Sequence, residues 1–274
     1  MKIAAILFLF LSLAACGGTA TNSNTNVPTT NSAISSTPAA ADGVHTVTID
    51  SPDGLKLVGS FYPVLYPASN PHMPALLLLH QWQSDRHSYD DFAKRMQDQG
   101  FAVLSIDGRG FGESTKTADG KTISPGRTDA DVKAMLGDVG AAFDFLATQK
   151  NVDSTKIAIV GASYGSSLAL IYAAENPRVS AVALLSPGLN YFGNMPTEPA
   201  LKKFGKRPFY IAAADDDNES AEAVRSLAAG VNGPAHISKV FSKGGHGTSL
   251  LTSQPDLVDE LKSFCTWFVL RPSK

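Results

Sequence analysis

A serine at residue 163 stands in a setting that suits a nucleophile. It is the centre of Gly-Ala-Ser-Tyr-Gly (residues 161–165), which follows an apolar, β-branched run (156–160) and precedes a helical pattern (166–175). The pattern predicts a strand, a sharp turn and a helix, with Ser163 at the apex where a base can reach its hydroxyl. The flanking glycines suit a bend at which the two backbones pass too close for a Cβ atom. The alternative is a structural turn with an incidental serine.

A serine hydroxyl is a weak nucleophile at neutral pH, so it needs a base and a carboxylate that orients the base. His246 is the candidate base because it follows a predicted strand (237–241) and lies between glycines that let its loop reach the serine. The alternative for His246 is a solvated loop histidine. Four other histidines are expected to be surface or packing residues: His45, His72, His87 and His236.

Three consecutive carboxylates are candidates for the orienting acid. Asp215, Asp216 and Asp217 directly follow a predicted strand at residues 209–214. The acid partner of an imidazole belongs at such a strand end, but three adjacent candidates leave the register open. At least one of them is expected to be a solvated loop carboxylate or the N-cap of the following helix.

Acyl transfer also needs backbone N–H groups aimed at the developing oxyanion. One expected donor is the amide of Tyr164, and the other belongs to the loop after the predicted strand at residues 75–79. By position the second donor is the backbone of Trp82, with Gln81 as the weaker candidate. His80 is expected to hold this loop rather than to take part in the chemistry. None of these patterns calls for a cofactor or a metal ion.

The elements that must position these residues alternate along the chain. Strands at residues 44–49 and 55–62, separated by a turn signal, predict an N-terminal antiparallel hairpin. Apolar strands and helical patterns then alternate, which predicts an α/β fold: a mostly parallel central sheet with helices on both faces. The later strands are expected at residues 75–79, 101–106, 157–160, 179–185, 209–214 and 235–241, and the helices at 89–99, 132–146, 166–175, 219–229 and 256–270. Ligand sites in such sheets lie at the carboxyl ends of the strands, where every candidate residue falls.

Taken in chain order, these motifs resemble the α/β-hydrolase superfamily. The turn at Ser163 resembles its nucleophile elbow, and the loop from His80 resembles its oxyanion loop with Gln81 where glycine is common. Residues 107–114 resemble its Asp-x-Arg-Gly-x-Gly-x-Ser turn. The short layout and the leader described below are similar to dienelactone hydrolases and small esterase-like lipoproteins. Dienelactone hydrolases use a cysteine nucleophile, so their particular chemistry is not implied.

The resemblance also bears on individual residues. The superfamily often ends the acid-bearing strand with Gly-Glu-Asp-Asp-Pro, the last aspartate being catalytic, which implies Asp217 as the acid and Asp216 as the runner-up. It implies structural ion pairs or loop hydrogen bonds for Asp107 and Arg109. The implied function is a serine hydrolase acting on a small-molecule acyl substrate, a carboxylic ester. The alternatives are a small peptidase of the same fold and a non-catalytic binding lipoprotein.

The segment at residues 188–206 is the only place for a cap over the site. It mixes aromatic residues such as Tyr191 and Phe192 with prolines and lysines. This composition predicts a short helix or flap rather than a large lid. A fairly open site for small or extended acyl groups is therefore expected. The alternative is that Tyr191 and Phe192 only cover the edge of the core.

The N-terminus reads as a signal peptide at residues 1–15 with a positive start and an apolar stretch too short for a stable span. Its end, Leu-Ala-Ala-Cys, resembles the lipobox of bacterial lipoproteins, which implies lipidation of Cys16. Residues 16–42 then form a flexible tether, of which residues 17–41 carry no charge, and the hydrolase domain covers residues 43–274. The implied location is the bacterial cell envelope, with the domain anchored to a membrane outside the cytoplasm. The alternative is an ordinary secretory peptide cut after Ala15.

The charge composition argues against only one class of partner, nucleic acid. The chain of 274 residues carries 23 Lys+Arg and 25 Asp+Glu, and no basic patch points to nucleic acid. The oligomeric state is not predicted. Cys265, inside an apolar helical pattern, is expected to be a small buried hydrophobic residue.

Overall fold

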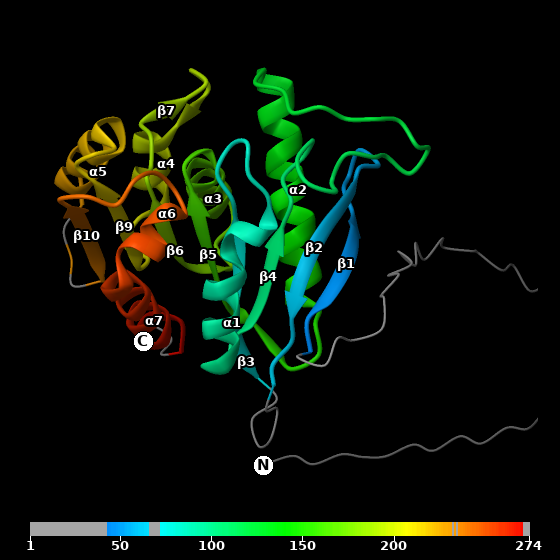
Figure 1. The fold of residues 1–274 in the computed structure, drawn as a ribbon, viewed down its shortest axis with the longest axis horizontal. Coiled ribbons are helices and arrows are strands. Elements are labelled where there is room, and N and C mark those ends of the chain that lie inside the picture. The colour runs from blue at the N-terminus through cyan, green and yellow to red at the C-terminus, as the bar shows by residue number, and fades with distance from the viewer. Residues whose placement is uncertain (1–42, 66–71, 232, 234, 271–274) are drawn as a thin grey trace, which may run out of the picture. The chain divides into compact units, whose positions relative to one another are not determined.

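A computed structural model describes residues 43–65, 72–231, 233 and 235–270 (Figure 1). All of these residues belong to one unit of the chain, Ala33–Lys274. The predictions about the signal peptide, Cys16 and the tether lie outside the described residues. The strands of the main sheet are β1 (His45–Asp50), β2 (Lys56–Tyr62), β3 (Met73–Leu79), β4 (Ala102–Ile106), β5 (Val152–Ala162), β6 (Val179–Leu185), β9 (Phe209–Ala214) and β10 (His236–Phe241).

The eight strands form one sheet in the order β1-β2-β4-β3-β5-β6-β9-β10. β1 and β2 form the predicted antiparallel hairpin, and β2 is also antiparallel to β4. All other neighbours in this sheet are parallel. The mostly parallel sheet expected from the sequence is therefore confirmed.

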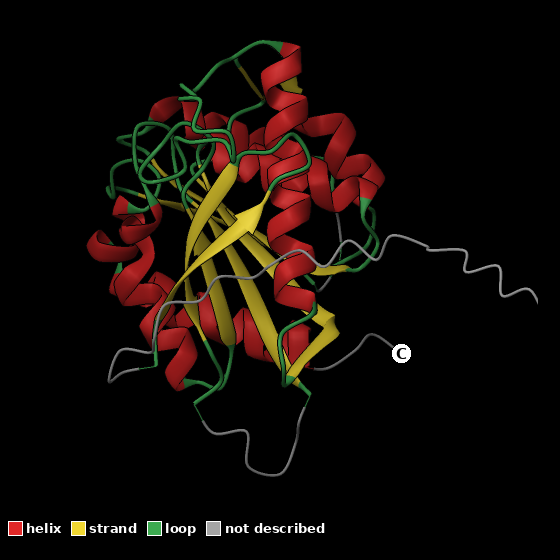
Figure 2. Ribbon diagram, turned by 90° about the vertical axis from the view of Figure 1, so that its right-hand side faces the viewer, coloured by secondary structure: helices red, strands yellow, loops and turns green. Residues whose placement is uncertain are grey.

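Helices cover both faces of this sheet (Figure 2). Alternate side chains of β3 point to opposite faces: Leu77 and Leu79 pack in one core cluster, Leu76 and Leu78 in the other. The first cluster includes side chains of α2, α3 and α5, the second those of α1 and α7. The helices are η1 (Arg86–Tyr89), α1 (Asp90–Asp98), α2 (Asp129–Ala147), α3 (Tyr164–Glu175), α4 (Thr197–Phe204), α5 (Asn218–Ala229), α6 (Ser249–Ser253) and α7 (Pro255–Leu270).

The register of the parallel strands brings their carboxyl ends to one edge of the sheet. The paired residues near those ends are Leu79 with Ile106 and Gly161, Ala162 with Leu185, Leu185 with Ala212, and Ala214 with Phe241. The loops that follow β3, β4, β5, β6, β9 and β10 therefore begin side by side. This edge is where ligand sites form in sheets of this kind.

The segment expected to form a flap contains a short hairpin and a helix. Its strands are β7 (Asn190–Tyr191) and β8 (Met195–Pro196), and α4 follows directly. This agrees with the prediction of a short helix or flap. The helix α6, which follows the loop of His246, was not predicted from the sequence. None of the described helices is long and apolar enough to cross a membrane.

Candidate active site

Ser163 occupies a strained turn between β5 and α3. Its φ and ψ angles are 54° and −125°, a conformation that a non-glycine residue rarely adopts. A Cβ atom on Gly161 would lie 2.2 Å from the carbonyl oxygen of Gly165, so a side chain is excluded there. A Cβ atom on Gly165 would lie 2.6 Å from the carbonyl oxygens of Leu79 and His80. Both glycines are therefore required, for the reason expected from the sequence.

The imidazole of His246 is paired with one of the three candidate carboxylates. Its Nδ1 lies 2.7 Å from Oδ2 of Asp217, whose side chain is only 15% exposed. A protonated Nδ1 that donates to this carboxylate leaves Nε2 free to accept a proton. The structure thus pairs His246 with Asp217 and not with the runner-up, Asp216.

The neighbouring carboxylates have different partners. Asp216 accepts hydrogen bonds from the backbone amides of Gly244 (3.1 Å) and Gly245 (3.0 Å), just before the histidine. These backbone donors hold the pKa of Asp216 below its ordinary value. Asp215 forms an exposed ion pair with Arg225. Asp217 therefore pairs with an imidazole, Asp216 with a loop backbone and Asp215 with a surface arginine. Their adjacent positions in the sequence could not reveal which aspartate has which partner.

Side chains from two other strand ends also hold the loop of His246. The amide of Gly247 donates to Oγ of Ser186 at 2.9 Å, and the hydroxyl of Thr248 donates to Oε1 of Gln81 at 2.9 Å. Ser186 directly follows Leu185, whose carbonyl accepts the amide of Ser163 at 2.8 Å. The serine turn and the histidine loop are therefore attached to consecutive residues at the end of β6.

The phenol of Tyr191 in the flap lies close enough to the side chain of Ser163 for the two to interact. Among the described residues, no hydrogen bond joins Ser163 to His246. Tyr191 also donates to the carbonyl of Ser186 at 3.1 Å, and burial raises the pKa of its phenol, so the group is neutral at physiological pH. Ser163 itself is only 4% exposed. The sequence analysis placed Tyr191 in the flap but gave no signal for this contact, which spans two loops.

The loop after β3 lies directly against the serine turn, because Gly165 touches the backbone of Leu79 and His80. Nδ1 of His80 donates to the carbonyl of Gln81 at 2.7 Å, and Nε2 accepts the amide of Gly108 at 2.8 Å. Burial lowers the pKa of His80, which suits this neutral form. These contacts confirm that His80 holds the loop.

The two expected oxyanion donors have amides available for a ligand. Within the described part of the chain, the backbone N–H groups of Trp82 and Tyr164 donate to no other residue. Tyr164 is the first residue of α3, where the N–H groups have no partner within the helix. The departure from glycine at Gln81 is accommodated because its side chain turns away to bind Thr248.

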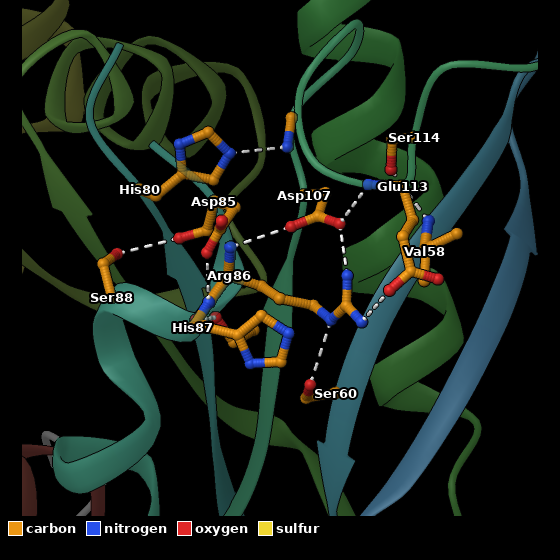
Figure 3. Close-up of polar contacts among 12 residues, drawn as sticks. Val58, Ser60, His80, Asp85, Arg86, His87, Ser88, Asp107, Glu113 and Ser114 are labelled. Carbon is orange, nitrogen blue, oxygen red and sulfur yellow. Dashed lines mark hydrogen bonds and ion pairs between the residues drawn. The ribbon is translucent and has the colours of Figure 1, made fainter. Parts of the chain in front are cut away.

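A buried ionic network supports the loops beneath this edge (Figure 3). Asp107, which is fully buried, accepts from the side chain and the backbone amide of Arg86 and from the amide of Glu113. Arg109 instead binds Asp138 and Asp53, with two hydrogen bonds to each carboxylate. Both residues make structural ion pairs, as expected, but with different partners and not with each other. Within the described residues no cluster of side chains could hold a metal ion.

The fold and the strained serine turn define an α/β-hydrolase. Residues 70–215 match the Hydrolase_4 family, described as serine aminopeptidase, S33. The chain belongs to this family. The matched residues include the strands from β3 to β9 and the serine turn, but not the loop of His246.

Relatives and solved structures agree with this class. An uncharacterized protein of Mycobacterium tuberculosis is 31% identical over 156 residues, which are 57% of this chain and 48% of the relative. Epoxide hydrolase A of the same organism is 28% identical over 180 residues, 61% of this chain and 51% of the relative. The chain thus spans about half the length of the curated relatives it matches.

Among solved structures, acetyl xylan esterase 1 from Thermoanaerobacterium aligns with a TM-score of 0.68 at 17% identity, over 86% of this chain and 87% of that one. An esterase from Pyrococcus furiosus aligns with a TM-score of 0.65 at 17% identity, over 82% and 91% of the two chains. At this identity the likeness concerns the fold.

Proposed function

We propose that the protein is a serine hydrolase that cleaves carboxylic esters through an acyl-enzyme on Ser163. The observation that carries the proposal is the strained turn at Ser163 beside an Asp217–His246 pair whose loop is attached to the same strand end. A strained backbone persists only where its surroundings enforce it, and such strain concentrates at functional sites. Here the enforced conformation presents a hydroxyl at the edge of the sheet.

In the proposed reaction, Ser163 rotates about its Cα–Cβ bond from Tyr191 toward His246 when substrate binds. Nε2 of His246 takes the hydroxyl proton while Oγ attacks the ester carbonyl, and Asp217 stabilises the imidazolium through Nδ1. The same histidine then protonates the leaving alcohol. A water molecule, activated by His246, hydrolyses the acyl-enzyme and restores the serine. Hydrogen bonds of this kind often form only when substrate is bound, so the resting contact with Tyr191 is compatible with the mechanism.

The amides of Trp82 and Tyr164 are the proposed oxyanion donors. Each such donor stabilises the transition state by roughly 3–4 kcal/mol where it has been removed in other hydrolases. Both amides have no other acceptor among the described residues, and the loop that carries Trp82 is held by His80. The backbone is therefore positioned before the reaction begins, which is the requirement for electrostatic stabilisation.

A fluorophosphonate probe tests the proposal directly, because it phosphonylates only an activated serine. We expect the purified domain to be labelled and the Ser163→Ala variant to be unlabelled, with ester turnover lower by about 10⁴- to 10⁶-fold. Ser167→Ala is a matched control, since Ser167 is a buried serine of α3, the helix that directly follows Ser163. Absence of labelling in the unaltered protein would favour a non-catalytic binding protein.

A peptidase is the second candidate, because the description of the matching family names an aminopeptidase. An ester and an amide with the same acyl group, whose leaving groups are an alcohol and the corresponding amine, distinguish the two activities. We expect the ester to be hydrolysed and the amide to resist, since the described cap consists only of the β7–β8 hairpin and α4. Amide turnover matching that of the ester would shift the assignment to a peptidase.

The short flap supports a preference for small or extended acyl groups. Tyr191 and Phe192 lie on a hairpin of a few residues, not on a large lid that could enclose a long chain. A panel of esters with acyl chains of increasing length should show higher turnover for the short members. A strong preference for long chains would contradict this part of the proposal.

We further propose that the domain is anchored in the cell envelope through a lipid on Cys16. The support is the sequence alone: an apolar leader, a lipobox-like end and a tether whose residues 17–41 carry no charge. Membrane fractionation of the full chain and of its Cys16→Ser variant, with mass analysis of the mature N-terminus, tests it. An unmodified N-terminus after Ala15 would indicate simple secretion.

A further inference from the structure

One arginine at the edge of the site has no carboxylate partner among the described residues. Arg127 is exposed, and its guanidinium carbon lies 4.8 Å from the centroid of the Trp82 ring and 5.0 Å from that of Phe192. Arg86 and Arg109, in the loops after β3 and β4, are by contrast buried against acids. The charge of Arg127 rests instead on two aromatic faces, an arrangement that leaves its N–H donors to solvent or ligand.

The two rings connect Arg127 to the serine from both sides. Trp82 packs edge-on against Tyr164, the residue after the serine, with ring centroids 5.3 Å apart. Phe192 adjoins Tyr191, with ring centroids 6.4 Å apart, and the phenol of Tyr191 lies close to Ser163. The rings of Trp82 and Phe192 also pack against each other, with centroids 4.8 Å apart. Arg127 therefore lies over the aromatic wall formed by Trp82 of the proposed oxyanion loop and Phe192 of the flap.

The backbone around Arg127 is fixed by the flap. The side-chain amide of Asn194 donates to the carbonyl of Arg127 at 3.0 Å and to the carboxylate of Asp129 at 2.9 Å. The next acid along, Asp131, forms a capping box with Thr128 at the start of α2. Within the described residues, neither of these acids forms an ion pair with Arg127. The guanidinium is therefore positioned before any substrate arrives and has no ion-pair partner among the described residues.

We propose that Arg127 binds a negatively charged group of the substrate, so that the site prefers esters that carry a carboxylate away from the scissile bond. This inference rests on the proposed ester hydrolysis and adds a substrate class to it. A guanidinium matches a carboxylate with two parallel hydrogen bonds, and its stacking on Trp82 and Phe192 restricts its motion. The aromatic wall accepts the apolar part of such a substrate between the charge and the serine.

The test compares p-nitrophenyl half-esters of dicarboxylic acids with p-nitrophenyl esters of uncharged acids of equal chain length. The measured quantity is the ratio of kcat/KM for the charged and the uncharged ester. We expect the ratio to favour the charged ester at one chain length, to fall about tenfold or more in Arg127→Met, and to be partly kept in Arg127→Lys. The preference should also weaken with added salt, because the charge is exposed.

Arg178→Met is the matched control. Arg178 also lies over an aromatic ring, 4.9 Å from the centroid of Phe143, but it is paired with Asp144. Its removal should leave the ratio unchanged.

If Arg127 only clamps the flap to Trp82, Arg127→Met lowers both rates equally and the ratio stays constant, which would overturn the inference. An unaltered protein that hydrolyses both esters equally overturns it as well. If no ester is hydrolysed and Ser163 is not labelled, the proposed function fails instead, and the two failures are thereby separated.

Discussion

The serine turn and the histidine loop reach the same edge of the sheet by different physical means. Ser163 is fixed by steric exclusion: Gly161 and Gly165 allow backbone contacts that no side chain would permit. His246 is 45% exposed in its side chain and is fixed by hydrogen bonds from other strand ends. The serine turn is therefore positioned by residues next to it in the sequence, whereas the histidine loop is positioned by residues far from it in the sequence.

The difference predicts where each region is vulnerable. Close backbone contacts tolerate no added volume, whereas a loop held by several hydrogen bonds loses precision gradually as each is removed.

Asp217→Asn, which changes the carboxylate paired with His246, should have the largest effect on catalysis. An amide in place of the carboxylate can donate to Nδ1, which favours the wrong tautomer of His246. We expect kcat for ester hydrolysis to fall about 10⁴-fold with little change in thermal stability. Asp215→Asn, at the exposed ion pair with Arg225, should leave kcat within a few-fold. Equal losses in the two variants would contradict the assignment of the acid.

Gly165→Ala tests the steric half of the comparison. The new Cβ would lie 2.6 Å from two carbonyl oxygens of the neighbouring loop, so the backbone must shift at a cost of about 1–3 kcal/mol. We expect a lower melting temperature together with a large loss of activity, because the loop of Trp82 moves too. In Gly137→Ala, within α2, the nearest atom is 3.7 Å away, and the melting temperature should hold or rise. A stable and active Gly165→Ala protein would refute the close contact.

Gln81→Ala should have an intermediate effect on the histidine loop. It removes the acceptor for both the amide and the hydroxyl of Thr248. At about 1 kcal/mol for each hydrogen bond, kcat/KM should fall about 10- to 30-fold while the melting temperature changes little. The matched control is Gln149→Ala at the end of α2, where the side chain binds only the carbonyl of Phe145. No loss of activity in Gln81→Ala would show that the remaining contacts suffice to hold the loop.

Asp216→Asn should give the smallest effect, and one that depends on pH. Two backbone N–H groups lower the pKa of Asp216 in the folded state. A lowered pKa means that the carboxylate stabilises the fold fully above its unfolded pKa of about 3.9, and that this is lost as pH falls through the lowered value. The melting temperature of the variant should therefore lie below that of the unaltered protein at pH 7 and converge with it in acid. A difference that persists at pH 2 would point to another cause.

Much of the fold could be predicted because it depends on local patterns. Continuous apolar runs predicted the buried strands of the parallel sheet, and β5 extends further than its apolar run because Val152 still pairs with Met73 of β3. The short helix α6 gave no periodic signal, since five residues are too few to show one.

The candidate site was predictable in part. The glycines and the strand before them predicted the turn at Ser163, and the flanking glycines singled out His246. The choice of Asp217 required a family resemblance, because three adjacent aspartates have the same chemistry and differ only in direction. The contacts of Tyr191 with Ser163 and of Gln81 with Thr248 could not be predicted; the latter pair is separated by 167 residues.

Most of the strands and helices and the serine turn follow from the sequence alone, because side-chain periodicity and backbone sterics act between near neighbours. Only the tertiary structure decided which carboxylate meets the imidazole, which side chains hold its loop, and that Arg127 lies on two aromatic rings beside the serine. Those outcomes depend on the register between strands and on side-chain directions. A shift of a single residue in a strand would reverse the direction of its side chains.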